Sequence, residues 1–153
     1  MKNKKLNLNS DVELEVTQFI HDIEAKEYKG CRYEFDSKII IQRTAKITPM
    51  KTGQFVTLWQ RDKTGVTCPL RNSSTFDFVI IICRNQKYFG YFLFPKEVLH
   101  KYKIISSKKS AGKRGFRVYP PWDRPESKQA HKTQSWQLNY FHEIEILSGI
   151  HLK

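Results

Sequence analysis

The sequence lacks the motifs that mark many metal-dependent and nucleotide-dependent enzymes. Its three cysteines form no Cys-x-x-Cys pair and its five histidines have no His-x-x-x-His spacing, so no zinc-site pattern is present. Neither of the glycine-rich phosphate-binding patterns, GxGxxG and GxxxxGKS/T, occurs among its 7 glycines, which argues against a nucleotide-dependent enzyme. We therefore expect no metal site and no cofactor.

The sequence also lacks a hydrophobic leader and a long apolar run. It starts MKNKKLNLNS, and the apolar run FVIIIC is too short to cross a bilayer. The cysteine count is odd, and the cysteines show no pairing pattern. We expect a cytoplasmic protein with free thiols and no membrane partner.

Negative charge is scarce in one part of the chain. The protein carries 27 Lys and Arg against 15 Asp and Glu, for a net charge of +12. Residues 96–132 hold eleven of the basic residues and three of the acids, so most of the surplus comes from this segment. Solubility alone does not require such segregation. A basic segment of this kind favours an anionic partner.

The chain is long enough for one domain with a hydrophobic core. Residues 1–9 are polar and basic and predict a loose tail, followed by a single α+β domain over residues 10–153. Ser10 and Glu13 have the spacing of a helix capping box. Apolar residues at 12, 16, 19, 20 and 23 then follow helical spacing, and Gly30 marks a stop. This pattern predicts a helix from Ser10 into the acidic segment 11–27.

From Cys31 onward the sequence predicts short strands separated by turns. The runs are CRYEF, KIIIQRT, GQFVTLWQR, FDFVIIIC, YFGYFLF and GFRVY. The continuous apolar run FDFVIIIC is typical of a central strand buried on both faces. A short helix is expected after Pro95 and another over residues 126–141. The fold class is α+β, with a mixed or antiparallel sheet flanked by helices.

The stretch AGKRGFRVYPPWD carries cations among aromatic residues. Strand alternation puts Phe116 and Val118 on one face, where we expect them in the core, and Arg117 on the other. Trp122, after two prolines, is either a structural plug or a platform for stacking bases. Further cations lie in AKITPMKTGQFVTLWQR and in the last predicted helix. The predicted nucleic-acid-binding residues are Lys46, Lys51, Lys108, Lys109, Lys113, Arg114, Arg117, Trp122 and Lys132.

Acidic residues next to buried strands suggest a second hypothesis. Metal-dependent nucleases of the restriction-endonuclease type place an Asp before one strand and an acid-x-Lys on the next. Asp77 and Lys96 fit, with Glu34 as a further acid, but Phe94 stands where the second metal-binding acid belongs. The site would be degenerate, and Mg²⁺ would be needed only in this case. We favour Asp77 as a strand-start turn residue or ion-pair partner.

Four blocks of the sequence resemble signature blocks of the bacterial MepB-like family. They are AKITPMKTGQFVTLW, FPKEVL, GKRGFRVYPPWD and KTQSWQLNYF, and the resemblance runs from about Glu27 to Phe141. It implies a small cytosolic bacterial protein that is related to restriction-endonuclease-like folds and binds nucleic acid. It transfers no catalytic residue, because the family has no defined catalytic set.

Three functions follow from these observations. The first is a nucleic-acid-binding protein, for DNA or RNA, that is largely sequence-nonspecific and non-catalytic. The second is a metal-dependent nuclease that uses Glu34, Asp77 and Lys96. The third is a protein-interaction module that binds an acidic partner.

Overall fold

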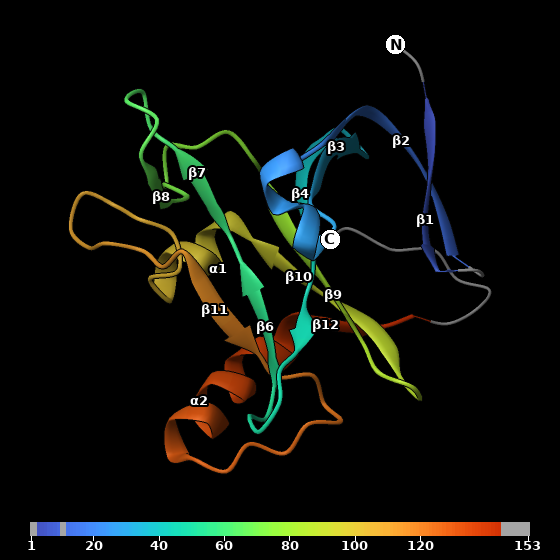
Figure 1. The fold of residues 1–153 in the computed structure, drawn as a ribbon, viewed down its shortest axis with the longest axis vertical. Coiled ribbons are helices and arrows are strands. Elements are labelled where there is room, and N and C mark those ends of the chain that lie inside the picture. Colours follow the sequence, from blue (N-terminus) through green and yellow to red (C-terminus); the bar gives the residue numbers. More distant parts are fainter. Residues whose placement is uncertain (1–2, 10–11, 145–153) are drawn as a thin grey trace.

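A seven-stranded mixed sheet forms the centre of the computed structural model, which describes residues 3–9 and 12–144 (Figure 1). Its strand order is β1-β2-β3-β4-β9-β10-β12. β4 and β9 pair in parallel, and the other neighbours are antiparallel. The strands are β1 Lys4–Asn9, β2 Val12–His21, β3 Cys31–Phe35, β4 Lys38–Thr44, β9 Phe78–Arg84, β10 Phe89–Pro95 and β12 Phe141–Glu143. The predicted α+β class with a mixed sheet is confirmed.

A smaller sheet lies across the large one and carries two of the predicted nucleic-acid-binding residues, Lys46 and Arg117. Its order is β11-β6-β5, and β7 pairs with β8 beside it. In Figure 1, β6 and β11 cross in front of β9 and β10, with α2 at their lower end. The strands are β5 Lys46–Ile47, β6 Gln54–Thr57, β7 Trp59–Arg61, β8 Thr67–Pro69 and β11 Gly115–Val118.

Helices are short and few. They are the 3-10 helix η1 Ile23–Tyr28, the α-helices α1 Lys96–Lys101 and α2 Lys128–Gln137, and the 3-10 helix η2 Leu138–Tyr140. The predicted helices after Pro95 and within 126–141 are therefore present. Over residues 3–9 and 12–144, no helix has the length and apolar character needed to cross a bilayer.

The apolar run in β9 separates two clusters of the core. Val79, Ile81 and Cys83 face one cluster, which includes residues of the small sheet and α1. Phe78, Ile80 and Ile82 face the other, which includes residues of β2, β3 and β4. Because side chains alternate along a strand, β9 is buried on both faces, as predicted.

The predicted helix from Ser10 through segment 11–27 is wrong, since residues Val12–His21 form β2. The run Val-Glu-Leu-Glu-Val alternates with a period of two, which buries Leu14 and Val16 and leaves Glu13 and Glu15 exposed. Only Ile23–Tyr28 is helical, as the short η1. Ser10 itself lies outside the described residues.

The prediction of a loose tail over residues 1–9 is also wrong from Lys4 onward. Lys4–Asn9 form β1, which pairs antiparallel with β2. Leu6 stands opposite Leu14 in this pairing and packs against the second core cluster. The pairing gives the polar segment a partner for its backbone groups, which composition alone does not reveal.

Candidate nucleic-acid interface

β11 divides the basic and aromatic stretch between two faces, as the alternation predicts. It pairs antiparallel with β6, with Phe116 opposite Val56 and Arg117 opposite Phe55. Phe116 and Val118 are buried in the first core cluster, whereas Arg117 lies on the opposite face and is half-buried. The strand therefore anchors one cation on the outer face of the small sheet.

Hydrogen bonds that the Arg117 guanidinium donates to the β5–β6 turn hold it in place. Its Nη1 donates to the carbonyl of Thr52 at 3.3 Å, and its Nη2 donates to the Oγ1 of Thr48. A guanidinium has five N–H donors, so donors remain for a ligand after these bonds are made. Arg117 is thus oriented by the fold while it can still bind an anion.

Arg117 lies where two cavities adjoin, and we call the two together the groove. The hairpin-side cavity, of about 900 Å³, lies between the β5–β6 turn and the segment after the two prolines. The helix-side cavity, of about 570 Å³, lies between α2 and the segment that leads into β11. Arg117, Tyr119, Ser127 and Ala130 line both cavities.

Cations outnumber acids along the groove. Lys51 and Arg124 line the hairpin-side cavity with Arg117, and Lys113 and Lys132 line the helix-side cavity. The two lining carboxylates are Asp123 and Glu126, both on the hairpin side. Among the described residues, the helix-side cavity is therefore lined by cations without a carboxylate, and the hairpin-side cavity is lined by charges of both signs.

Two glutamines of α2 shape the wall of the groove. Gln137 is fully buried; its Oε1 accepts from the amide of Tyr119 at 2.8 Å, and its Nε2 donates to the carbonyl of Arg117 at 2.9 Å. The Nε2 of Gln134 donates to the carbonyls of Pro120 and Asp123. Both side chains hold the end of β11 and the proline turn, so they are structural rather than free to grip phosphates.

Gly53 allows the β5–β6 turn to approach β11 closely. Its φ is +84°, and a Cβ at this position would lie 2.7 Å from the ring of Tyr119. Only a glycine adopts this conformation and leaves room for the ring without strain. The turn residues Thr48 and Thr52 are thereby brought within reach of Arg117.

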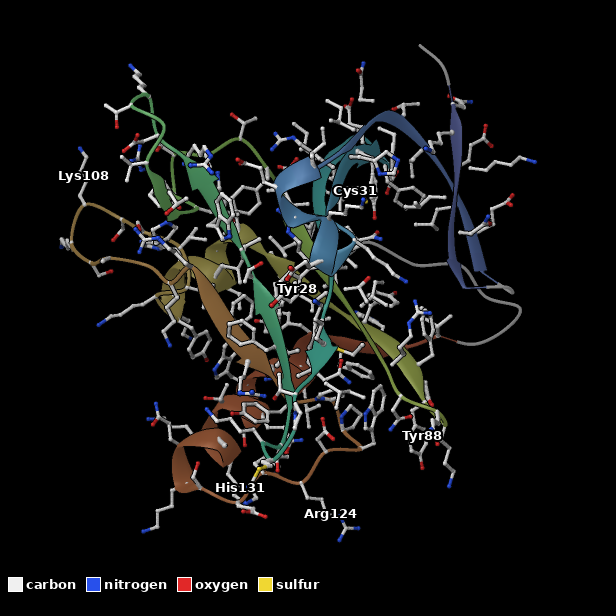
Figure 2. All side chains as sticks on the ribbon, viewed as in Figure 1. Tyr28, Cys31, Tyr88, Lys108, Arg124 and His131 are labelled. Atoms are coloured by element: carbon white, nitrogen blue, oxygen red, sulfur yellow. The ribbon has the colours of Figure 1, made fainter. Side chains whose placement is uncertain are left out.

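The Trp122 side chain packs against the first core cluster and also lines the groove. Its ring stacks on Tyr88 at a centroid distance of 5.3 Å and meets the edge of Phe141 at 5.6 Å. Tyr88 lies in the β9–β10 hairpin, is exposed, and is labelled in Figure 2. Sequence reasoning missed Tyr88 because an aromatic residue in a hairpin carries no signal of its distant partner.

The other predicted cations lie away from the groove. Arg114 donates to the carbonyl of Thr67 at 2.8 Å and so points toward β8. Lys46 lies over the ring of Tyr28 and 3.5 Å from a carboxylate oxygen of Glu27. Lys108 and Lys109 line a separate cavity of about 640 Å³ with Arg71 and His100. Figure 2 shows Lys108 on a loop well away from Arg124 and His131.

The proposed nuclease residues lie at one end of the large sheet, where the protein uses two of them structurally. The Oδ2 of Asp77 accepts from the amide of Ile39 at 2.8 Å, so Asp77 joins the starts of β4 and β9. The Nζ of Lys96 donates to the carbonyl of Ser74. Glu34 stands opposite Ile39 on β3. Among residues 3–9 and 12–144, no group of three or more His, Cys, Asp or Glu is placed to hold a metal ion.

The buried thiols are not placed for nucleophilic chemistry. Cys31, Cys68 and Cys83 are free, and burial raises the pKa of Cys31 to about 11. Burial also raises the pKa of Cys83. A thiol is a nucleophile as its thiolate, so neither buried cysteine supplies one near neutral pH.

Asp123 has a perturbed carboxyl group and lines the groove. Burial raises the pKa of its half-buried carboxyl group above the ordinary value for Asp, because a desolvated charge is disfavoured. A perturbed carboxyl group in a cavity is a candidate for function. Sequence reasoning counted Asp123 among the acids of the basic segment but assigned it no role, because its burial depends on the folded proline turn.

Comparisons with known proteins confirm the family resemblance. A model of the MepB-like family matches residues 22–143, a span that contains the whole groove. A solved structure described as "Crystal Structure of MepB" is 34% identical, with a TM-score of 0.81, and the match covers 84% of this chain and 86% of that chain. A search of curated proteins finds no match.

Proposed function

The chain belongs to the MepB-like family, and we propose that it binds single-stranded nucleic acid in the groove, without catalysing a reaction. Binding is largely independent of sequence, because phosphates are the main ligands of Lys and Arg side chains and carry no sequence information. This assignment rests on the residues of the groove and not on the name of the related structure.

One observation carries the proposal: five cations line the two adjoining cavities of the groove, which hold only two carboxylates within the described residues. Lys113 and Lys132 flank Arg117 on one side, and Lys51 and Arg124 flank it on the other. A groove of this kind attracts a polyanion along its length. The anchored Arg117 at its centre supplies a fixed donor for one phosphate.

The shape and the aromatic residues favour a single strand over a duplex. Each cavity has a volume that suits a ligand of nucleotide size, and a base enters a cavity only when it is unpaired and unstacked. Tyr119 lines both cavities, and Tyr88 is exposed beside Trp122. Aromatic side chains next to cations are typical of surfaces that bind single strands.

A salt titration tests the proposal. Fluorescence anisotropy of labelled single- and double-stranded DNA and RNA should show tighter binding of the single strands, with an affinity that falls as salt rises. If the five cations each neutralise a phosphate, the slope of log K against log salt should approach roughly −3.5. Absence of binding at low salt would contradict the proposal, and so would affinity that does not change with salt.

A further inference from the structure

Gln54 is a buried residue of the hairpin-side cavity with an unpaired hydrogen-bond acceptor. Its side chain is 1% exposed, and its Nε2 donates to the carbonyl of Arg84 at 3.2 Å. A carbonyl only accepts, so this bond identifies the nitrogen of the amide and leaves Oε1 as the other atom. Oε1 has no hydrogen-bond partner within the described residues, although Gln54 lines the cavity.

Asp123 supplies a second acceptor to the same cavity. Its backbone is fixed, because its amide donates to the carbonyl of Pro120 and its carbonyl accepts from Gln134. Its half-buried carboxylate forms no ion pair with any part of the chain that the structure describes, even though Lys51, Arg117 and Arg124 line the same cavity. The cavity is thus lined by three cations and by a carboxylate that is not paired with any of them.

Two acceptors that have no partner within the described residues favour a ligand that donates hydrogen bonds. A free metal cation is disfavoured here, because three cationic side chains line the cavity. A nucleobase with an exocyclic amino group brings donors without positive charge, and carboxylates accept from such groups in known recognition of bases. The cations can then contact the phosphates on either side of that base.

The four bases differ in how well they match this pair of acceptors. Guanine presents two adjacent donors, N1–H and the 2-amino group, which a carboxylate can accept together. Cytosine and adenine each offer one amino group. Uracil and thymine offer a single N–H between two carbonyls, and those carbonyls would face the oxygens of Asp123 and Gln54.

We propose that the hairpin-side cavity selects one base of the bound strand by its exocyclic amino group, with Asp123 and Gln54 as acceptors and guanine as the best fit. The inference rests on the proposed function and adds to it a base preference at one position. Binding elsewhere in the groove stays independent of sequence.

The test compares three short single strands of one backbone, whichever of DNA or RNA the salt titration favours. The first contains only thymine or uracil, the second has guanine at every third position, and the third has hypoxanthine in place of guanine. Hypoxanthine keeps N1–H but lacks the 2-amino group. We expect the guanine strand to bind about tenfold more tightly than the first, with the hypoxanthine strand between them. This comparison needs no variant of the protein.

Two variants assign the preference to a residue. Asp123→Asn should reduce the ratio of guanine to thymine affinity to below about twofold, since the bidentate acceptor is lost. Glu126→Gln removes the same charge from the lining of the same cavity and should leave the ratio unchanged. Thermal unfolding establishes that both variants are folded.

The outcomes separate this inference from the proposed function. Equal affinity of the wild-type protein for all three strands would overturn the base preference while the nucleic-acid-binding function stands. A preference that survives in Asp123→Asn would overturn the role of Asp123. Absence of binding to every strand would overturn the proposed function, and the inference with it.

Discussion

The groove and the cavity beside Lys108 are both basic, but the structure holds their cations to different degrees. Arg117 is held by two side-chain hydrogen bonds, and its carbonyl is bound by the buried Gln137. Lys108 and Lys109 are exposed on a loop whose serines bond mainly to one another and to the loop backbone. Most cations of both regions lie in the same basic segment, residues 96–132, so charge alone does not distinguish a binding site from a solvated surface.

The largest expected effect concerns Gln137, whose side chain holds the end of β11 beside the groove. Gln137→Leu removes the partners of the Tyr119 amide and the Arg117 carbonyl, both of which it bonds from a fully buried position. Leaving buried polar groups unsatisfied costs about 1–3 kcal/mol each. The free energy of unfolding, measured by urea denaturation, should fall by about 2–4 kcal/mol.

Gln129→Leu is the matched control for that change. Gln129 lies on the same helix and is exposed, so its substitution should change stability by less than about 0.5 kcal/mol. If the two variants had equal free energies of unfolding, the end of β11 would not depend on Gln137. The cations of the groove would then be held no more firmly than those of the loop beside Lys108.

The next largest effect is a loss of nucleic-acid affinity, which should depend on whether the substituted cation lies in the groove or outside it. Arg117→Ala should weaken binding of a single strand roughly tenfold, because a charge-assisted hydrogen bond to phosphate contributes about 1.5 kcal/mol or more. Arg114→Ala removes the same charge three residues earlier in the chain, from a side chain bound to Thr67. Its effect on affinity should be below about threefold. Anisotropy titrations at one salt concentration measure both.

Paired lysine variants extend the same comparison to the loop. The double substitution of Lys113 and Lys132 by Ala should reduce the salt slope by about 1.4, as expected when two phosphate contacts of a single strand are lost. The double substitution of Lys108 and Lys109 by Ala should leave the slope nearly unchanged. Equal losses in both doubles would show that the protein binds through diffuse charge rather than through the groove.

The sequence was sufficient to predict most strands from Cys31 onward, because their apolar runs and turn residues are local signals. It misled at Val12–His21, where capping-box spacing and apolar residues at helical intervals competed with a two-residue alternation. The alternation prevailed because it buries Leu14 and Val16 in the second core cluster. Burial against a partner that lies far along the chain is a tertiary effect, which local propensity does not contain.

The candidate site was predictable in its charges but not in its acceptors. Lys51, Lys113, Arg117 and Lys132 were expected from charge segregation and strand alternation, and all four line the groove. Lys46, Arg114, Lys108 and Lys109 were expected on the same grounds and lie elsewhere. The side-chain oxygens of Gln54, which is buried, and of Asp123, which is half-buried, stand out because they have no partner within the described residues. No sequence pattern records this property of the folded chain.

The smallest expected effect concerns the stability cost of the unpaired Asp123. Burial raises its pKa in the folded state, so the folded protein disfavours the ionised form, and stability is lost as the pH rises through that raised pKa. The charged groups that line its cavity are Lys51, Arg117, Arg124 and Glu126, and the buried Cys83 lies close enough to interact with it.

Asp123→Asn should therefore be slightly more stable than the wild-type protein at neutral pH. The gain should stay below about 1 kcal/mol, because the carboxylate is only half-buried and solvent screens it. It should shrink as the pH falls toward 3.8, the ordinary value for Asp, where the wild-type carboxyl group becomes neutral. Urea denaturation across this pH range measures it. A loss of stability at neutral pH would instead show that the carboxylate makes a stabilising bond within the protein, and would remove the reason to assign it a ligand.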